Sequence, residues 1–181
     1  SFGLFTRKVK LSGEAYFSVA KEKGRPFIVN LNEIDVKVTG TRFNAKSYIT
    51  DNIITVSLEE GNVIILDTNN KEYPLKVGEI ADYDRKTGIC TVNEVEDMTL
   101  HTAWRTKNLN FYRTPLKEIL KTLERQYDVQ FLVNDSSLLN YKFSFSTSRV
   151  NAKEILEDLE KVSKIRFAKN GNNSFKVTTM R

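Results

Sequence analysis

The stretch KEILKTLE, residues 117–124, returns as KEILEDLE at residues 153–160, an offset of 36. In both copies the apolar residues recur at the spacing of one helical face. The same offset carries Phe131 onto Phe167, and both phenylalanines lie in short alternating segments typical of strands. The repeat therefore predicts two strand–helix–strand units that follow one another in the chain.

Two such units make a βαββαβ domain, which we place at residues 107–181. We expect a small two-layer sandwich with both helices on one face of a single sheet. Thr114 is the expected N-cap of the first helix, with Pro115 at its first position. Asn151 is the expected N-cap of the second helix.

The first half of the chain has the pattern of strands throughout. Residues 34–38 alternate between apolar and polar side chains, as in a half-buried strand. Turn signals separate such runs, and Gly40 is expected to supply a tight turn. We predict an all-β sandwich or roll at residues 1–93 and a connector at residues 94–106, in which Trp104 packs the junction. The expected fold class is thus β + α/β.

Charge separates the same regions. The 181-residue chain has a net charge of +5, but residues 107–181 alone carry 14 basic and 8 acidic side chains, a net of +6. This asymmetry indicates two domains and, for the second, a partner that tolerates positive charge. No apolar run approaches the roughly 20 residues that span a bilayer.

Residues that carry catalysis are scarce. His101 is the only histidine and Cys90 the only cysteine, which leaves little for a catalytic triad or a transition-metal site. Cys90 lies in an apolar stretch and is expected to be a buried small hydrophobe. We therefore predict no enzymatic activity, no cofactor and no metal.

A cytoplasmic single-stranded RNA-binding protein is the alternative interpretation of the basic second domain. Phe143 and Phe145 could stack bases, as in single-strand RNA readers. They alternate with polar residues, however, so one strand face holds both rings. Since the sheet needs an apolar face under its helices, we favour a core role for both and predict no nucleic-acid partner.

Several motifs resemble a known family. They follow its β-domain pattern in order: LSGEAYFSVA at 11–20, RPFIVN at 25–30, VTGTRFNAKSY at 38–48, VSLEEGNV at 56–63 and LKVGEIADY at 75–83. That family is the FecR-like anti-sigma regulators of the Bacteroidetes type, in their periplasmic part. The stretch WRTKNLNFYRTPLKEILKTLERQYDVQF at 104–131 resembles the start of the family's C-terminal domain. That domain is similar to the short N-terminal domain of secretins and TonB-dependent transporters.

The resemblance implies transmembrane signalling. A TonB-dependent, often SusC-like, outer-membrane transporter senses a glycan or an iron chelate. Its N-terminal signalling domain docks on the C-terminal region of the regulator, which is the periplasmic part of a single-pass inner-membrane protein. The regulator controls an extracytoplasmic-function sigma factor through a cytoplasmic segment. That segment, the membrane helix and the family's early strands are absent from this chain, so we expect incompletely paired edge strands in the first domain.

Docking of the transporter domain is expected to use an exposed sheet edge, because two small domains can share strands through main-chain hydrogen bonds. We predict two candidate edge strands. The first comprises Lys142, Phe143, Ser144, Phe145 and Ser146, and the second comprises Ser174, Phe175, Lys176, Val177 and Thr178.

Overall fold

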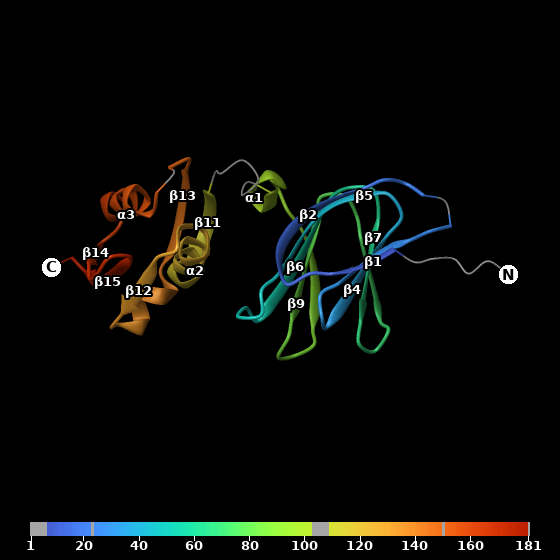
Figure 1. Ribbon diagram of the computed structural model, residues 1–181, viewed down its shortest axis with the longest axis horizontal. Helices are drawn as coiled ribbons and strands as arrows, with labels where there is room; N and C mark the ends of the chain where they lie inside the picture. Colours follow the sequence, from blue (N-terminus) through green and yellow to red (C-terminus); the bar gives the residue numbers. More distant parts are fainter. Residues whose placement is uncertain (1–6, 23, 103–108, 150, 181) are drawn as a thin grey trace. The chain divides into compact units, whose positions relative to one another are not determined.

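The structure is a computed structural model that describes residues 7–22, 24–102, 109–149 and 151–180. The chain divides into two compact units, Ser1–Thr102 and Ala103–Arg181 (Figure 1). The first unit is built from strands and the second combines strands with two longer helices. The predicted β + α/β class is confirmed.

The first unit is a β-sandwich. One five-stranded sheet has the order β1-β3-β4-β7-β8, and the other has the order β10-β9-β6-β5-β2. The bounds in the first sheet are β1 Arg7–Lys10, β3 Phe27–Asn30, β4 Ile34–Val38, β7 Val63–Asp67 and β8 Glu72–Leu75. Those in the second are β10 Cys90–Glu94, β9 Glu79–Asp84, β6 Ile53–Glu60, β5 Thr41–Ser47 and β2 Gly13–Val19.

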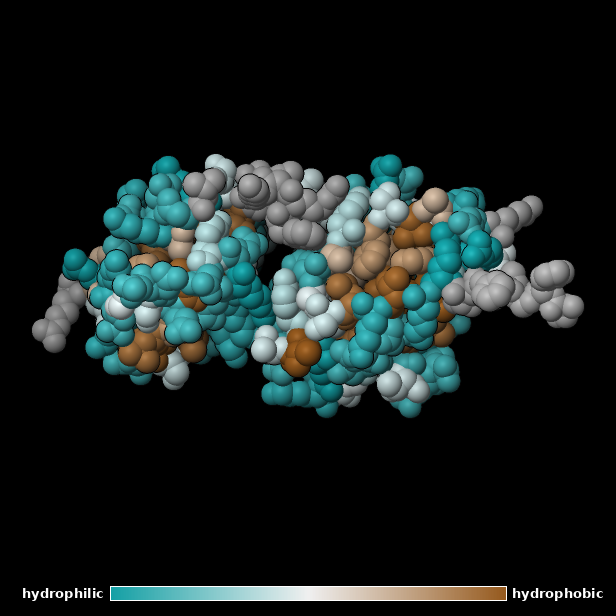
Figure 2. Space-filling model, viewed as in Figure 1, coloured by the Kyte–Doolittle hydropathy of each residue, from teal (hydrophilic) through white to brown (hydrophobic). Residues whose placement is uncertain are grey.

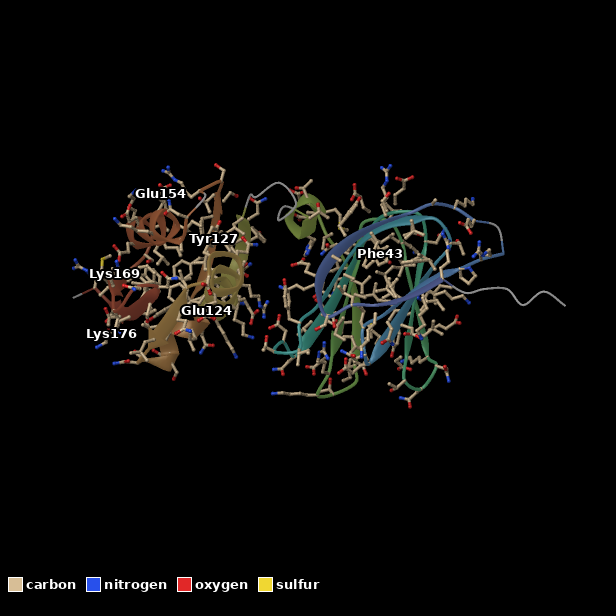
Figure 3. The ribbon with its side chains drawn as sticks, in the orientation of Figure 1. Phe43, Glu124, Tyr127, Glu154, Lys169 and Lys176 are labelled. Atoms are coloured by element: carbon tan, nitrogen blue, oxygen red, sulfur yellow. The ribbon has the colours of Figure 1, made fainter. Side chains whose placement is uncertain are left out.

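Period-2 alternation explains the core of this sandwich. Val36 in β4 and Val56 in β6 are fully buried, while their strand neighbours are more exposed or polar. Phe43 in β5 is also fully buried (Figure 3) and stacks on Phe17 with ring centroids 5.0 Å apart. Figure 2 shows apolar side chains over the part of this unit where β1, β2 and β5 are labelled in Figure 1. β1 and β2 end their sheets and each pairs with one strand of the described residues.

Two glycines allow a close approach of the turns beside β5. Gly40 has φ +153°, and a Cβ there would lie 2.7 Å from Cβ of Lys21. Gly61 has φ +92°, and a Cβ there would lie 2.5 Å from the carbonyl oxygen of Gly40. No other residue fits such contacts without backbone movement. The tight turn predicted at Gly40 is therefore confirmed.

The connector region contains a short helix, α1 (Thr99–Thr102), after the end of β10. His101 lies in this helix and is half-buried. The packing predicted for Trp104 falls outside the described residues.

The second unit contains the predicted repeat. It runs β11 (Leu109–Pro115), α2 (Leu116–Tyr127), β12 (Gln130–Val133), the 3-10 helix η2 (Ser136–Asn140), β13 (Lys142–Thr147), α3 (Ala152–Lys161), β14 (Ile165–Lys169) and β15 (Ser174–Thr179). The expectation of a single sheet is wrong. Among the described strands, β11 pairs only with β13, and a separate sheet has the order β12-β15-β14. The two helices and both sheets contribute to one apolar core.

The two helices begin differently. Asn151 caps α3 as predicted, since its Oδ1 accepts the N–H of Glu154 at 3.0 Å. Thr114 is not a cap: it belongs to β11, and Pro115 takes the N-cap position without a side-chain hydrogen bond. The N–H of Leu116 instead donates to the carbonyl of Tyr141 at 2.8 Å. The chain entering β13 thus satisfies one of the first backbone donors of α2, which have no partner within the helix.

Candidate functional site: the sheet edges of the second unit

One of the two strands predicted as docking edges is not an edge. β15, which contains Ser174, Phe175, Lys176, Val177 and Thr178, lies in the middle of its sheet. It pairs in parallel with β12 and antiparallel with β14. Its main chain therefore faces a neighbour on each side, and a partner strand has no free edge to join.

Side chains take two outward-facing donors of the edge strand β14. The hydrogen bonds from Met180 N to Lys164 O (2.7 Å) and from Asn170 N to Ser174 O (2.8 Å) fix which residues of β14 face β15. By alternation, Ile165 and Phe167 then point their N–H groups outward. The N–H of Phe167 donates to Oε1 of Glu160 at 2.6 Å, and that of Ile165 donates to Oγ of Ser163 at 3.2 Å.

One outward-facing donor of the edge strand β12 is taken in the same way. The N–H of Gln130 donates to the carbonyl of Asn173 at 2.8 Å, on the side of β15. The N–H of the next residue, Phe131, donates to Oε1 of Glu124 (labelled in Figure 3) at 3.2 Å. A glutamate in the last turn of each helix thus accepts a hydrogen bond from an outward-facing donor of the strand that follows.

The two glutamates are equivalent in the sequence repeat, although sequence reasoning did not assign them a role. Glu124 ends KEILKTLE and Glu160 ends KEILEDLE, and each precedes its phenylalanine by seven residues. The usable signal was the pair itself: the same acidic residue recurs before the same strand position.

β11 is an edge of irregular shape. Its register shifts between Phe111 and Thr114, and Arg113 within this bulge has φ +47°. Pro115 at the end of the strand has no N–H to offer. Bulges and prolines are common means of preventing strand addition.

β13 is the regular edge that remains. Because Leu116 N donates to Tyr141 O and Phe143 is opposite Thr114, alternation places the N–H and C=O of Lys142, Ser144 and Ser146 on the side away from β11. All three residues are exposed. Within the described residues, no side chain accepts a hydrogen bond from these three amides. This strand therefore has the geometry needed for strand addition.

The inward face of β13 contributes to the core, as predicted. Phe143 and Phe145 pack against the buried cluster of the unit. The ring centroid of Phe145 lies 4.9 Å from that of Phe111. The faces that base stacking would require are thus engaged within the protein, which weakens the RNA-binding alternative.

The single cysteine and the single histidine of the chain both lie in the first unit. Burial, followed by the nearby Asp82 carboxylate, raises the pKa of Cys90 to about 11, and this half-buried residue packs against the sandwich core. Burial is also the main cause that lowers the pKa of His101. Among the described residues, no group of three or more His, Cys, Asp and Glu side chains could hold a metal ion. No helix in the same ranges is both long and apolar enough to cross a membrane.

Comparison with known proteins agrees with this two-unit organisation. A family model described as FecR protein matches residues 4–64, and one described as FecR, C-terminal matches residues 108–176. Among proteins of curated function, none matches the chain significantly.

Two crystal structures of a candidate anti-sigma factor from Parabacteroides distasonis resemble the whole chain. The structure at 1.65 Å resolution has a TM-score of 0.85 and 27% sequence identity, over 96% of this chain and 81% of that chain. The structure at 2.50 Å resolution has a TM-score of 0.86 and 27% identity, over 99% of this chain and 83% of that chain.

Proposed function

Because the chain belongs to the FecR family of anti-sigma regulators, we propose that it is the periplasmic sensor region of a single-pass inner-membrane anti-sigma factor. In this proposal it receives a signal from a TonB-dependent, SusC-like outer-membrane transporter and controls an extracytoplasmic-function sigma factor. In this proposal the sigma factor is bound by a cytoplasmic segment of the anti-sigma factor. The role is regulatory and requires no cofactor.

The open edge of β13 carries the docking part of the proposal. The outward-facing main chain of Lys142, Ser144 and Ser146 offers alternating donors and acceptors to an added strand. The partner is the N-terminal signalling domain of the transporter, whose own edge strand extends the sheet of β11 and β13. Main-chain hydrogen bonds supply affinity in this mode of recognition, and the side chains on alternate positions supply selectivity.

Calorimetric titration tests the proposal directly. The N-terminal signalling domain of the matching TonB-dependent transporter is titrated into the 181-residue chain. We expect one-to-one binding with a dissociation constant below about 100 μM, the weak end of specific association. Absence of binding at that concentration contradicts the proposal.

A proline at position 144 locates the contact on β13. Ser144→Pro removes an outward-facing N–H, and we expect at least about a tenfold loss of affinity because one edge donor and the local strand geometry are lost. The substitution also removes Oγ of Ser144, which accepts the N–H of Arg113 at 2.8 Å. Ser144→Ala removes only this hydroxyl and is the matched control, which should retain binding. Equal binding by wild type and Ser144→Pro would exclude the β13 edge.

A further inference from the structure

A cavity of about 310 Å³ opens beside the start of β13. Its lining comes from the first residues of β13, the start of β14 with the turn before it, and the end of β15: Tyr141, Lys142, Phe143, Ser163, Lys164, Ile165, Thr179 and Met180. Pockets that bind small molecules begin at roughly this volume. The cavity has room for a side chain from a partner.

Exposed apolar side chains gather at this cavity. Tyr141 is 56% exposed and Met180 is 39% exposed, and both line it. Val162, which immediately precedes the lining residue Ser163, is 65% exposed. Exposed apolar groups that lie together, with polar groups around them, are typical of protein-binding surfaces.

The charges at the cavity have one sign. Lys142 and Lys164 are its charged lining residues. In the described ranges, neither ammonium group forms an ion pair. A second cavity, between α3 and the β14–β15 hairpin, contains Glu157 and Glu160 as well as lysines, so its charges compensate each other. The first cavity is the one that favours an acidic ligand.

The cavity is also continuous with the open edge. Phe143 lines the cavity and belongs to β13, whose outward-facing main chain begins at Lys142. A strand added along β13 places alternate side chains on the same face as Phe143. The side chain opposite Phe143 therefore lies over the cavity.

We propose that the cavity receives one apolar side chain of the docked partner strand, and that Lys142 and Lys164 bind a carboxylate next to that side chain. The inference rests on the proposed function, because the docked strand brings the side chain to the cavity. It specifies the partner chemically: an extended segment of the signalling domain with an apolar anchor and an adjacent Asp or Glu.

Two matched peptides probe the cavity without the transporter. Acetylated and amidated Thr-Phe-Asp and Thr-Phe-Lys are titrated into the full 15N-labelled chain up to about 5 mM, a range suited to millimolar affinity. We expect Thr-Phe-Asp to shift the amide signals of Phe143, Ile165 and Thr179. The lysine peptide should bind about threefold more weakly, the size expected of a partly exposed ion pair.

Charge reversal provides the matched control for this titration. Lys142→Glu combined with Lys164→Glu should reverse the preference between the two peptides, whereas Lys117→Glu combined with Lys153→Glu on the helices should leave it unchanged. The inference is overturned if neither peptide shifts the cavity signals, if both bind equally, or if the shifts map to the second cavity at Leu156 and Phe175.

The transporter domain then separates this inference from the proposed function. Tyr141→Asp should weaken its binding at least about tenfold, since a charge replaces part of the apolar wall. Tyr112→Asp alters another exposed tyrosine of the unit, away from the cavity lining, and should bind as wild type. Equal binding by Tyr141→Asp and wild type overturns the cavity inference and leaves the proposed function. Peptide binding at the cavity without any binding of the transporter domain contradicts the proposed function and leaves the cavity as a site for an apolar side chain beside a carboxylate.

Discussion

The edge strands β14 and β13 differ in what happens to their outward-facing backbone N–H groups. On β14, the outward-facing N–H of Phe167 is taken by Glu160 and that of Ile165 by Ser163. On β13, the outward-facing amides of Lys142, Ser144 and Ser146 have no such acceptor within the described residues. Unpaired strand edges invite association with other chains, and folded proteins commonly cover them. The contrast indicates that β13 is kept accessible.

The two repeats make this contrast informative. Glu124 and Glu160 each take one outward-facing donor of corresponding strands in the two copies, so this contact is a pattern of the unit and not of one helix. β13 begins the second copy, as β11 begins the first, but it has neither the bulge nor the proline of β11. Among the described strand edges of this domain, β11, β12 and β14 each have at least one obstruction, whereas β13 is regular.

The largest effect is expected when the glutamates that accept hydrogen bonds from β12 and β14 are both removed. We expect Glu124→Ala combined with Glu160→Ala to lower the free energy of unfolding by about 2–3 kcal/mol, because two strand donors lose their acceptors. The new edges should also promote self-association. Urea unfolding and light scattering measure the two effects, and Glu118→Ala combined with Glu157→Ala on the same helices is the control. An unchanged, monomeric double variant would show that the glutamates do not close the edges.

Single substitutions should show which of the two glutamate contacts contributes more to stability. The contact of Glu160 is 2.6 Å and that of Glu124 is 3.2 Å, so Glu160→Ala should cost more, about 1–2 kcal/mol against less than about 1 kcal/mol. Glu160→Gln keeps an oxygen acceptor and should retain much of the stability. Urea midpoints test the order, and a larger loss for Glu124→Ala would be inconsistent with these contacts.

Removing the cap residue should cost more stability in α3 than the corresponding substitution before α2. Asn151→Ala should destabilise the unit by about 0.5–2 kcal/mol, since Asn151 caps the helix that carries Glu160. Thr114→Ala should change the unfolding free energy by less than about 0.5 kcal/mol, because Thr114 caps no helix. Thermal unfolding of both variants provides the comparison. Equal losses would mean that Thr114 has a role that its contacts do not reveal.

The smallest expected effect is the slow alkylation of Cys90, which allows a cysteine introduced at a strand edge to be labelled selectively. Its thiol stays protonated until the pH approaches its pKa of about 11, so little reactive thiolate exists at pH 7.5. We expect iodoacetamide to modify Cys90 at least about tenfold more slowly than a cysteine at an exposed edge position, as in Ser146→Cys. The rate at Cys90 should continue to rise with pH beyond 9, where the exposed thiol levels off. A plateau for Cys90 near pH 8.5 would contradict the raised pKa.

The sequence predicted most of the local structure of the second unit but not its sheet arrangement. The repeat and the alternating strands follow from short-range periodicity, which a sequence displays directly. The position of β15 does not, because it depends on parallel pairing between residues 130–133 and 174–177, far apart in the chain. A final strand was therefore predicted as an edge, although it inserts between β12 and β14.

The candidate site was predicted in part for the same reason. The strand from Lys142 to Ser146 was predicted as a candidate edge, and its alternation predicted that Phe143 and Phe145 belong to the core. The closing roles of Glu124 and Glu160 could not be read from periodicity, since their partners are backbone N–H groups seven residues away. Only the folded geometry shows that these carboxylates act on strand edges.

Hydrogen exchange on the full chain, with and without the transporter signalling domain, tests the central claim most directly. We predict that binding slows exchange at the amides of Lys142, Ser144 and Ser146, because an added strand supplies their missing acceptors. The amides of Ile165 and Phe167 on β14 and of Phe131 on β12 should exchange at unchanged rates. New protection on β14 or β12, with none on β13, would contradict the account.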